Sequence, residues 1–272
     1  MTVKIQLTEA RSILSPTKIP GSDYAANPYI GCTHACKYCY ACFMKRFTNH
    51  PEPWGEFLDV KYWPAIKNPG KYKGKRILVG TATDPYLPQE VKFCRTRAFL
   101  EEMKTSGAQI SILTKSHLVV RDLDLLKQIE HISVAFSINT LDEKFRRDMD
   151  RTSPIQRRLE AMQEIHAAGI PTATFISPIF PGITDSKAIM DAVKDRCDEV
   201  WLENLNLRGE YRPRIMAYIK ANYPQLLPLY QQIYVAKDRG YWQALAIELD
   251  AYASKLGIGL INYFYHEEIR KP

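Results

Sequence analysis

Residues 132–179 decide the fold class, because a strand, a helix and a second strand follow one another in this segment. The segment reads ISVAFSINTLDEKFRRDMDRTSPIQRRLEAMQEIHAAGIPTATFISPI. Its ends, ISVAFSI (132–138) and TATFISPI (172–179), are apolar runs typical of strands that are buried on both faces of a parallel sheet. Between them, PIQRRLEAMQEIHAAG (154–169) has a proline suited to a first turn and a glycine suited to a C-cap. Four of its residues fall at helical spacing: Leu159, Met162, Ile165 and His166.

The same alternation of strand and helix patterns runs along most of the chain. Further strands are predicted at RILVGT (76–81), QISILT (109–114) and EVWLENL (199–205), and each has a helix candidate after it. With a first strand just before Cys32, the chain contains about six βα units, so we expect an α/β fold, a partial (β/α)6 barrel of the TIM type. The final apolar run, GIGLINYFY (257–265), is expected to close or flank the sheet. No GxGxxG turn follows the first strand and no GxxxxGK[ST] occurs, so nucleotide cofactors of those two kinds are not predicted.

The composition indicates a globular protein. Of 272 residues, 46% are hydrophobic and 25% are charged, which is close to the globular average. We expect a single domain over 1–272, with a core at about 25–205 and a short C-terminal extension of helices and a strand at about 206–272. The first residues, MTVKIQLTEARSIL, lack the pattern of a signal peptide, and no run approaches the roughly 20 apolar residues of a membrane span. A cytoplasmic location without membrane association is therefore expected.

The net charge of +7 permits an anionic partner such as a nucleic acid. The basic residues are scattered, however, and the densest basic stretch is FRRDMDRTSPIQRR (145–158), where Asp148 and Asp150 dilute the arginines. We interpret this stretch as a solvated helix face.

Four of the six cysteines lie in NPYIGCTHACKYCYACF (27–43). Cys32, Cys36 and Cys39 have the spacing CxxxCxxC, and three thiolates in one compact loop can hold three corners of a cubane iron-sulfur cluster while the fourth iron stays open. Zinc is the alternative, with Cys36 and Cys39 as a CxxC pair and Cys42 or His34 as further ligands, although no second CxxC or HxxxH follows. A third interpretation is that these cysteines are buried thiols or redox-active thiols that bind no metal.

Polar residues follow the predicted strands. In parallel α/β folds the reactive groups lie at the carboxyl ends of strands, where variable loops are held by a rigid sheet. These residues should therefore lie close together and near the cysteine loop, at the end of the barrel that we call the mouth. They are Thr83, Asp84, Lys115, Ser116, Ser137, Asn139, Pro178, Asn204 and Asn206.

The cysteine motif, CxxxCxΦC with the aromatic Tyr38 at Φ, resembles that of the radical S-adenosylmethionine (radical SAM) superfamily, whose fold is a partial (β/α)6 barrel. Within it, the chain is similar to the spore photoproduct lyase-like group from about 27 to 185. The motifs that carry this similarity are NPYIGCTHACKYCYA, VGTATDPYLPQE (79–90), ILTKSHLVVRDLDLL (112–126) and FSINTLDEKF (136–145).

The resemblance implies a [4Fe-4S] cluster on Cys32, Cys36 and Cys39 and S-adenosylmethionine (SAM) as cofactor. It implies a reduced cluster that cleaves SAM to a 5′-deoxyadenosyl radical, which removes hydrogen from a substrate, and an external one-electron donor of the flavodoxin or ferredoxin type. The implied cofactor contacts are Tyr38 against the cluster or adenine, Thr83 and Asp84 at the amine, Lys115 at the carboxylate, Ser137 and Asn139 at the ribose, and Pro178 at the adenine. An acceptor for an ammonium, a cation for a carboxylate and small polar groups for a diol are chemically suitable partners.

The sequence departs from the lyases at one point. Thr81 and Ala82 stand where those enzymes carry a cysteine hydrogen donor, so cleavage of thymine dimers is not expected. Cys94 and Tyr86 are the candidate hydrogen donors in its place. Further residues that could contact a substrate are Glu203, Asn204, His266 and Glu267, whereas Cys42 is expected to pack on a helix and Cys197 in the core.

The substrate and the reaction subclass (lyase, transferase or oxidoreductase) stay open. A nucleic acid or nucleotide, a peptide and a small metabolite are the candidate substrate classes, and a monomer or weak dimer is expected. The alternative class is a zinc-stabilised nucleic-acid-binding module without catalysis.

Overall fold

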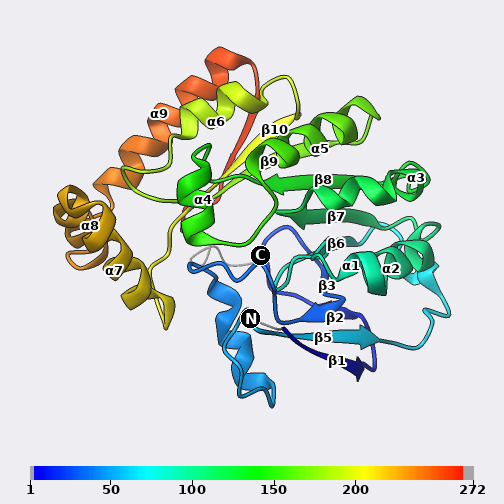
Figure 1. Ribbon diagram of the computed structural model, residues 1–272. Helices are drawn as coiled ribbons and strands as arrows, with labels where there is room; N and C mark the ends of the chain where they lie inside the picture. The colour runs from blue at the N-terminus through cyan, green and yellow to red at the C-terminus, as the bar shows by residue number, and fades with distance from the viewer. Residues whose placement is uncertain (1–2, 266–272) are drawn as a thin grey trace.

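The computed structural model describes residues 3–265, which form two β-sheets with surrounding helices. Within this range the main sheet has the strand order β11-β10-β9-β8-β7-β6-β3-β2. Its neighbours pair in parallel, except that β2 and β3 pair antiparallel. The strands are β2 (Leu14–Pro16), β3 (Tyr24–Ala26), β6 (Arg76–Val79), β7 (Gln109–Thr114), β8 (Ile132–Ser137), β9 (Thr172–Ile179), β10 (Glu199–Asn204) and β11 (Gly259–Asn262). Figure 1 shows β6 to β10 side by side in chain order.

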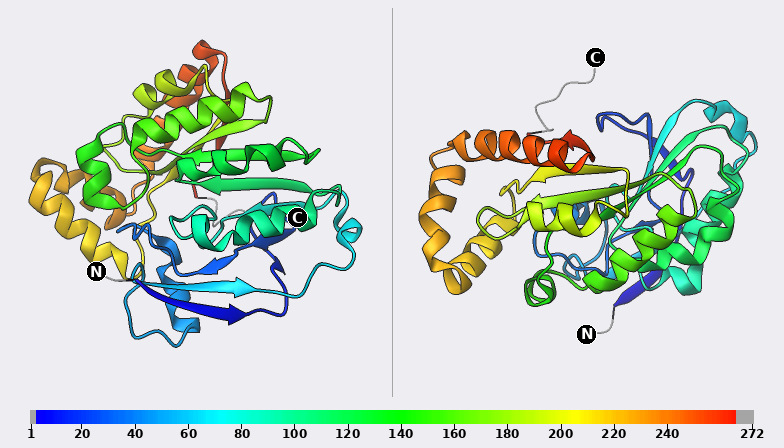
Figure 2. Two further views of the ribbon diagram at one scale, coloured as in Figure 1. Left: turned by 45° about the vertical axis from the view of Figure 1, so that its right-hand side comes forward. Right: turned by 90° about the horizontal axis from the view of Figure 1, so that it is seen from above.

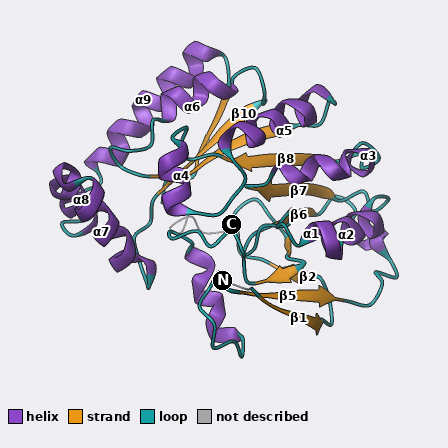
Figure 3. Ribbon diagram, viewed as in Figure 1, coloured by secondary structure: helices purple, strands orange, loops and turns teal. Residues whose placement is uncertain are grey.

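Helices follow the strands of the main sheet, as the sequence predicts. Figure 3 shows helices, in purple, alternating with the orange strands along the chain. They are α1 (Glu90–Phe93), α2 (Arg95–Met103), α3 (Leu123–Leu126), α4 (Glu143–Met149), α5 (Ile155–Ala167), α6 (Ser186–Val193), α7 (Tyr211–Asn222), α8 (Leu227–Tyr234) and α9 (Gly240–Leu256). The 3-10 helices are η1 (Tyr40–Phe47), η2 (Pro69–Tyr72), η3 (His117–Asp122) and η4 (Pro224–Leu226). The mostly parallel sheet with these crossovers confirms the prediction of a mixed α/β fold of the partial-barrel type.

The core lies between the main sheet and its helices. Along β7 the buried residues alternate, and Ile110 and Ile112 join the main apolar cluster. On α5, Leu159, Met162 and Ile165 fill the same cluster, as their helical spacing predicts. Burying each such side chain stabilises the fold by about 1.5–3 kcal/mol, so this face fixes α5 on β8 and β9.

The first strand is placed differently from the sequence prediction. The parallel part of the main sheet begins with β3, which ends at Ala26, whereas Tyr29–Ile30, just before Cys32, form β4 of a second sheet. That three-stranded sheet has the order β1-β5-β4, with β1 (Lys4–Glu9) parallel to β5 (Phe57–Tyr62). The left view of Figure 2 shows β1 and β5, in blue and light blue, at the bottom of the molecule, away from α9, in orange and red, at the top.

The basic stretch at 145–158 is not simply a solvated face, and this part of the sequence interpretation is wrong. Arg158 is 1% exposed and donates to the carbonyl oxygen of Ser137 at 2.8 Å. Arg146 is also buried and pairs with Glu143 at 2.6 Å. Arg158 shares the buried face of α5 with Ile155 and Leu159, which is why it points inward.

The C-terminal segment returns to the main sheet. After α7 and α8, α9 packs against α6 and β11 pairs with β10, so the final apolar run flanks the sheet as predicted. A second apolar cluster joins Tyr211 and Tyr230 of this segment to Tyr38 of the cysteine loop. No helix among residues 3–265 is both long and apolar enough to cross a membrane.

Candidate active site

The loop after β6 turns sharply over the end of that strand. Gly80 has φ +97°, and a Cβ there would lie 2.5 Å from the carbonyl oxygen of Leu113. Only glycine adopts this conformation without strain at so close a backbone approach. The turn places Thr83 and Asp84 at the mouth, where the hydroxyl of Thr83 donates to the carbonyl oxygen of Tyr29 at 3.1 Å.

Asp84 joins three segments of the mouth. Its carboxylate accepts hydrogen bonds from the Thr114 hydroxyl at 2.7 Å and from the Lys115 amide at 2.6 Å. The Nε2 of His34, in the cysteine loop, lies 3.2 Å from Asp84 Oδ2. Burial alone would raise the pKa of Asp84, but His34 and these hydrogen bonds outweigh it, so the pKa lies below its ordinary value. The Asp84 carboxylate thus connects the cysteine loop to the ends of β6 and β7.

Lys115 extends from the end of β7 across the mouth. Its Nζ donates to the Ser137 hydroxyl and, at 3.3 Å, to the carbonyl oxygen of Ser177. The same Nζ lies 5.6 Å from the centroid of the Tyr38 ring. Lys115, Ser137 and the Ser177–Pro178 end of β9 are therefore brought together beside the cysteine loop, as the sequence predicts for strand ends.

Asn139 carries a buried donor that has no partner among the described residues. The residue is 2% exposed, and its Nδ2 lacks a hydrogen bond. A buried amide N–H without an acceptor is costly, so such a group at a strand end points to a ligand that supplies an oxygen. A ribose hydroxyl of SAM has the required chemistry, and Asn139 therefore fits the cofactor implied by the sequence resemblance.

The cysteine loop folds back on itself in tight turns. The amide of Ala35 donates to Cys32 O and the amide of Cys39 to Cys36 O, both at 3.1 Å. Gly55 (φ +101°) comes so close that a Cβ on it would lie 2.7 Å from the Cβ of Ala35. The loop that contains Gly55 therefore packs closely against the cysteine loop at Ala35.

The three cysteines share an environment that disfavours free thiolates. Burial raises the pKa of Cys32 to about 12 and that of Cys39 to about 11, and it also raises the pKa of Cys36. Coordination to iron deprotonates a thiol outright, so the charge would be carried by the metal site. Among residues 3–265, no three or more His, Cys, Asp or Glu side chains converge closely enough to share one metal ion. A cubane makes no such demand, because each sulfur binds a different iron.

Tyr38 closes the inner side of the loop. It is 7% exposed, its hydroxyl donates to Asp150 Oδ2 at 2.8 Å, and its ring meets Phe180 edge-on at 5.6 Å. Burial and the neighbouring Asp150 raise its pKa, so the phenol stays protonated. A fixed, neutral ring here fits the packing role predicted for Tyr38.

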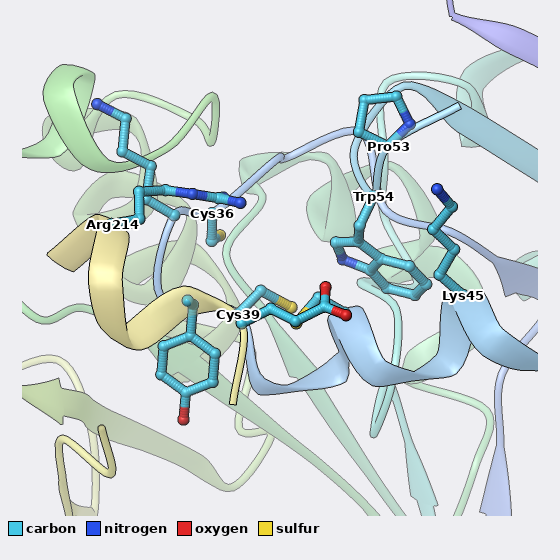
Figure 4. Close-up of a pocket in the computed structure, with 10 residues that line it drawn as sticks. Cys36, Cys39, Lys45, Pro53, Trp54 and Arg214 are labelled. Atoms are coloured by element: carbon cyan, nitrogen blue, oxygen red, sulfur yellow. The ribbon is translucent and has the colours of Figure 1, made fainter. Parts of the chain in front are cut away.

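A cavity of about 120 Å³ opens beside Cys36 and Cys39, two of the three cysteines of the CxxxCxxC motif (Figure 4). Its residues come from three segments: the cysteine loop with η1, the loop at Pro53 and Trp54, and the start of α7. The lining consists of Cys36, Lys37, Cys39, Cys42, Lys45, Pro53, Trp54, Glu210, Tyr211 and Arg214. Cys42 lines this cavity, and Cys197 is in the core with its sulfur 3.2 Å from the Thr174 hydroxyl.

The two candidate hydrogen donors are not brought to the mouth. Tyr86 is fully buried in the main apolar cluster, 6.0 Å from the Arg121 guanidinium, because its side chain turns under the loop that carries it. Cys94 sits between α1 and α2, with its sulfur 3.8 Å from the carbonyl oxygen of Val91. Of the other predicted substrate contacts, Asn204 accepts from the Tyr265 amide at 3.0 Å, whereas His266 and Glu267 lie outside the described residues.

Other side chains at the mouth were missed by the sequence reasoning. Tyr40, next to the last cysteine of the motif, donates its hydroxyl to the carbonyl oxygen of Thr81. Phe175 and Trp201 are paired across β9 and β10, and their rings meet at 6.0 Å. Glu203, two residues beyond Trp201, was predicted from the sequence as a possible substrate contact, and it accepts a hydrogen bond from the Ser177 hydroxyl. The period of two along a strand was the available signal, since it places Phe175 with Ser177 and Trp201 with Glu203 on one face.

The fold and the mouth together define a partial barrel whose polar strand ends lie beside a loop that carries the CxxxCxxC cysteines. The chain belongs to the radical SAM superfamily, because the model of that superfamily matches residues 26–193. It is accordingly a radical SAM enzyme, and this family implies a 4Fe-4S cluster and SAM.

Two relatives and one solved structure illustrate the range of similarity. An uncharacterized protein of Methanocaldococcus jannaschii is 37% identical over 83% of this chain and 86% of its own length. A protein of Pseudomonas phage M6, named radical SAM Nalpha-GlyT isomerase, is 27% identical over 57% of this chain and 33% of its own length. Spore photoproduct lyase complexed with dinucleoside spore photoproduct has a TM-score of 0.58 and 16% identity, covering 81% of this chain and 66% of that chain, which shows a shared fold.

Proposed function

We propose that Cys32, Cys36 and Cys39 hold one [4Fe-4S] cluster and that the strand ends around it bind SAM. When bound, these groups supply one-electron cleavage of the sulfonium S–C5′ bond and a carbon radical that removes a hydrogen atom from the substrate. The observation that carries the proposal is the convergence of a cation, a hydroxyl and an unpartnered buried amide, from Lys115, Ser137 and Asn139, beside the cysteine loop.

The chain's own residues would bind and orient the cofactor. The ammonium of Lys115 pairs with the carboxylate of SAM, and charge-assisted hydrogen bonds of this kind are the strong ones. Ser137 and Asn139 bond the ribose, Pro178 lines the adenine, and the loop of Thr83 and Asp84 takes the amine. Because Asp84 already accepts from Thr114 and Lys115, it also positions that loop.

We further propose a single domain, with the core at about 25–205 and an extension at about 206–272 that packs on it. An external one-electron donor of the flavodoxin or ferredoxin type supplies the reducing electron. A non-catalytic zinc-stabilised module is not favoured, because the chain belongs to an enzyme superfamily.

The candidate substrate classes are a nucleic acid or nucleotide, a peptide, and a small metabolite. Two observations support a nucleic acid or nucleotide. Spore photoproduct lyase, which shares the fold, has been solved with a dinucleoside spore photoproduct. In this chain, the partly buried residues Phe175 on β9 and Trp201 on β10 each lie two residues before Ser177 and Glu203, respectively. Aromatic rings stack well on planar bases.

Anaerobic reconstitution with iron and sulfide tests the proposal. Wild-type protein should acquire a cubane, seen by its visible absorption and by iron and sulfide content, and should convert SAM to 5′-deoxyadenosine after reduction. Cys36→Ala should lose both properties, whereas Cys42→Ala, the matched change in the same cavity, should keep the cluster. Normal cluster content in Cys36→Ala would contradict the ligand assignment.

A further inference from the structure

The cavity beside Cys36 and Cys39 is bordered by positive charge. Lys37 and Lys45 line it from the cysteine segment and Arg214 lines it from α7, and we call these three residues the basic rim. Figure 4 shows Arg214 and Lys45 on opposite sides of Cys39. Glu210 is the acidic residue within the lining.

Exposed aromatic side chains adjoin the basic rim on η1. Phe43 is 45% exposed and Phe47 is 67% exposed. The guanidinium of Arg46 lies 5.3 Å from the centroid of Phe43 and 4.6 Å from that of Phe47. Large exposed rings next to arginine and lysine are a composition typical of protein interaction surfaces.

This surface reaches the cysteines from a side that is separate from the proposed SAM site. None of the cavity's lining residues is Thr83, Asp84, Lys115, Ser137, Asn139 or Pro178. A reductant has to approach the cluster, whereas it need not approach SAM. The opening is therefore in the right place for a redox partner.

We propose that the basic rim, with Phe43, Arg46 and Phe47, docks an acidic electron-carrier protein of the flavodoxin or ferredoxin type. The inference rests on the proposed function, since the cluster is the electron acceptor. In the transfer, the reduced carrier loses one electron and the oxidised cluster gains it, and no bond or proton is exchanged. Complementary charge steers such an encounter and fixes its orientation.

Single-stranded nucleic acid is the competing occupant, because it also binds basic and aromatic side chains. The surface is centred on two proposed cluster ligands, Cys36 and Cys39, which a nucleic acid has no need to approach. We therefore favour the electron carrier.

The test measures how fast the reconstituted holoprotein is reduced by an acidic flavodoxin, followed by the loss of the cluster's visible absorption and by its paramagnetic signal. Lys45→Glu with Arg214→Glu should slow this reduction roughly 10- to 100-fold at low ionic strength, and the difference should shrink as salt is added. Lys45→Gln with Arg214→Gln should give a smaller loss. This milder pair guards against misfolding, since Lys45 also donates to the carbonyl oxygen of Pro51 at 3.1 Å.

Lys73→Glu with Lys104→Glu is the charge-matched control, because both lysines line a separate cavity that contains Gly107 and His131 and no cysteine. Its reduction rate should stay near that of wild type. Photoreduced deazariboflavin, which is uncharged, should reduce all variants equally.

Equal rates with flavodoxin for wild type, rim variant and control would overturn the proposal, as would an equal loss in the control. Binding of a single-stranded oligonucleotide that depends on Lys45 and Arg214, with flavodoxin reduction unaffected, would reassign the surface to nucleic acid. If deazariboflavin reduces no variant, the proposed cluster fails. Docking is then judged separately, by measuring the binding of flavodoxin to the apoproteins. Weaker binding by the rim variant alone supports the docking surface, and equal binding by wild type, rim variant and control refutes it.

Discussion

Replacing Lys115 with methionine removes the one cationic group that the proposal assigns to SAM while keeping most of the side chain's volume. In the structure Lys115 Nζ donates to Ser137 and Ser177 and lies over Tyr38. The expected loss is that of one charge-assisted hydrogen bond, about 1.5–3 kcal/mol. Since 1.36 kcal/mol corresponds to a factor of ten, the dissociation constant for SAM should rise roughly 10- to 160-fold.

The free energy of unfolding should change much less than the affinity. The carbonyl oxygen of Ser177 keeps a second donor, the Ser137 hydroxyl at 3.1 Å, so the substitution leaves no buried acceptor unpaired there. We expect the apoprotein to lose no more than about 1 kcal/mol in chemical denaturation. The cluster content should match that of wild type, because Lys115 is not a proposed ligand.

Equilibrium dialysis of SAM against the reconstituted protein measures the effect. Lys187→Met is the matched control, since Lys187 pairs with Glu248 on the surface at 2.5 Å and such pairs contribute about 0–1 kcal/mol. The control should bind SAM like wild type. A change below about threefold in Lys115→Met would place the carboxylate partner elsewhere and refute the reasoning.

Three further substitutions test other parts of the mouth. Asn139→Leu removes the unpartnered buried Nδ2, so it should leave the stability of the apoprotein unchanged or raised. The same change should weaken SAM binding, measured by dialysis, by about 0.5–1.5 kcal/mol. Parallel losses of stability and affinity would contradict a ligand role. Gly80→Ala forces a Cβ to within 2.5 Å of the carbonyl oxygen of Leu113 at positive φ, so urea denaturation should show a loss of about 1–3 kcal/mol, and an unchanged midpoint would disprove the strain. Glu90→Gln weakens the bonds that this buried carboxylate makes with Arg121 at 2.8 Å and with the Tyr29 hydroxyl, and it should lower the free energy of unfolding by about 1–3 kcal/mol; full stability in the same assay would show the network to be dispensable.

The parts of the fold that could be predicted from the sequence are those with a strong local signal. The strands at 109–114 and 172–179 have the predicted bounds, because short runs rich in β-branched and apolar residues are typical of strands. The second sheet was missed because β1 has only two large apolar residues, Ile5 and Leu7, and both are exposed. The pairing of β1 with β5 at residues 57–62 joins segments that are far apart in the chain, and no local sequence pattern predicts such a pairing.

The site divides along the same line. Strand-end positions predicted which residues approach the mouth, since the carboxyl ends of parallel strands share one edge. They did not predict side-chain direction, and Tyr86 accordingly turns into the core from the same loop that presents Asp84. Arg158 could have been recognised as buried, because it lies at helical spacing with Ile155, Leu159 and Met162.

The C-terminal segment shows most clearly what the sequence alone leaves out. The sequence predicts residues 206–272 as an extension beyond the motifs, yet Glu210, just before α7, and Tyr211 and Arg214 of α7 line the cavity beside the cysteines. Tyr211 and Tyr230 also pack in the same cluster as Tyr38, so the extension supports the inner wall of the cysteine loop as well as its outer rim. A change in this segment therefore acts on both sides of the proposed cluster, and variation here is a direct route by which this fold could alter the access of an electron donor without changing a single cysteine.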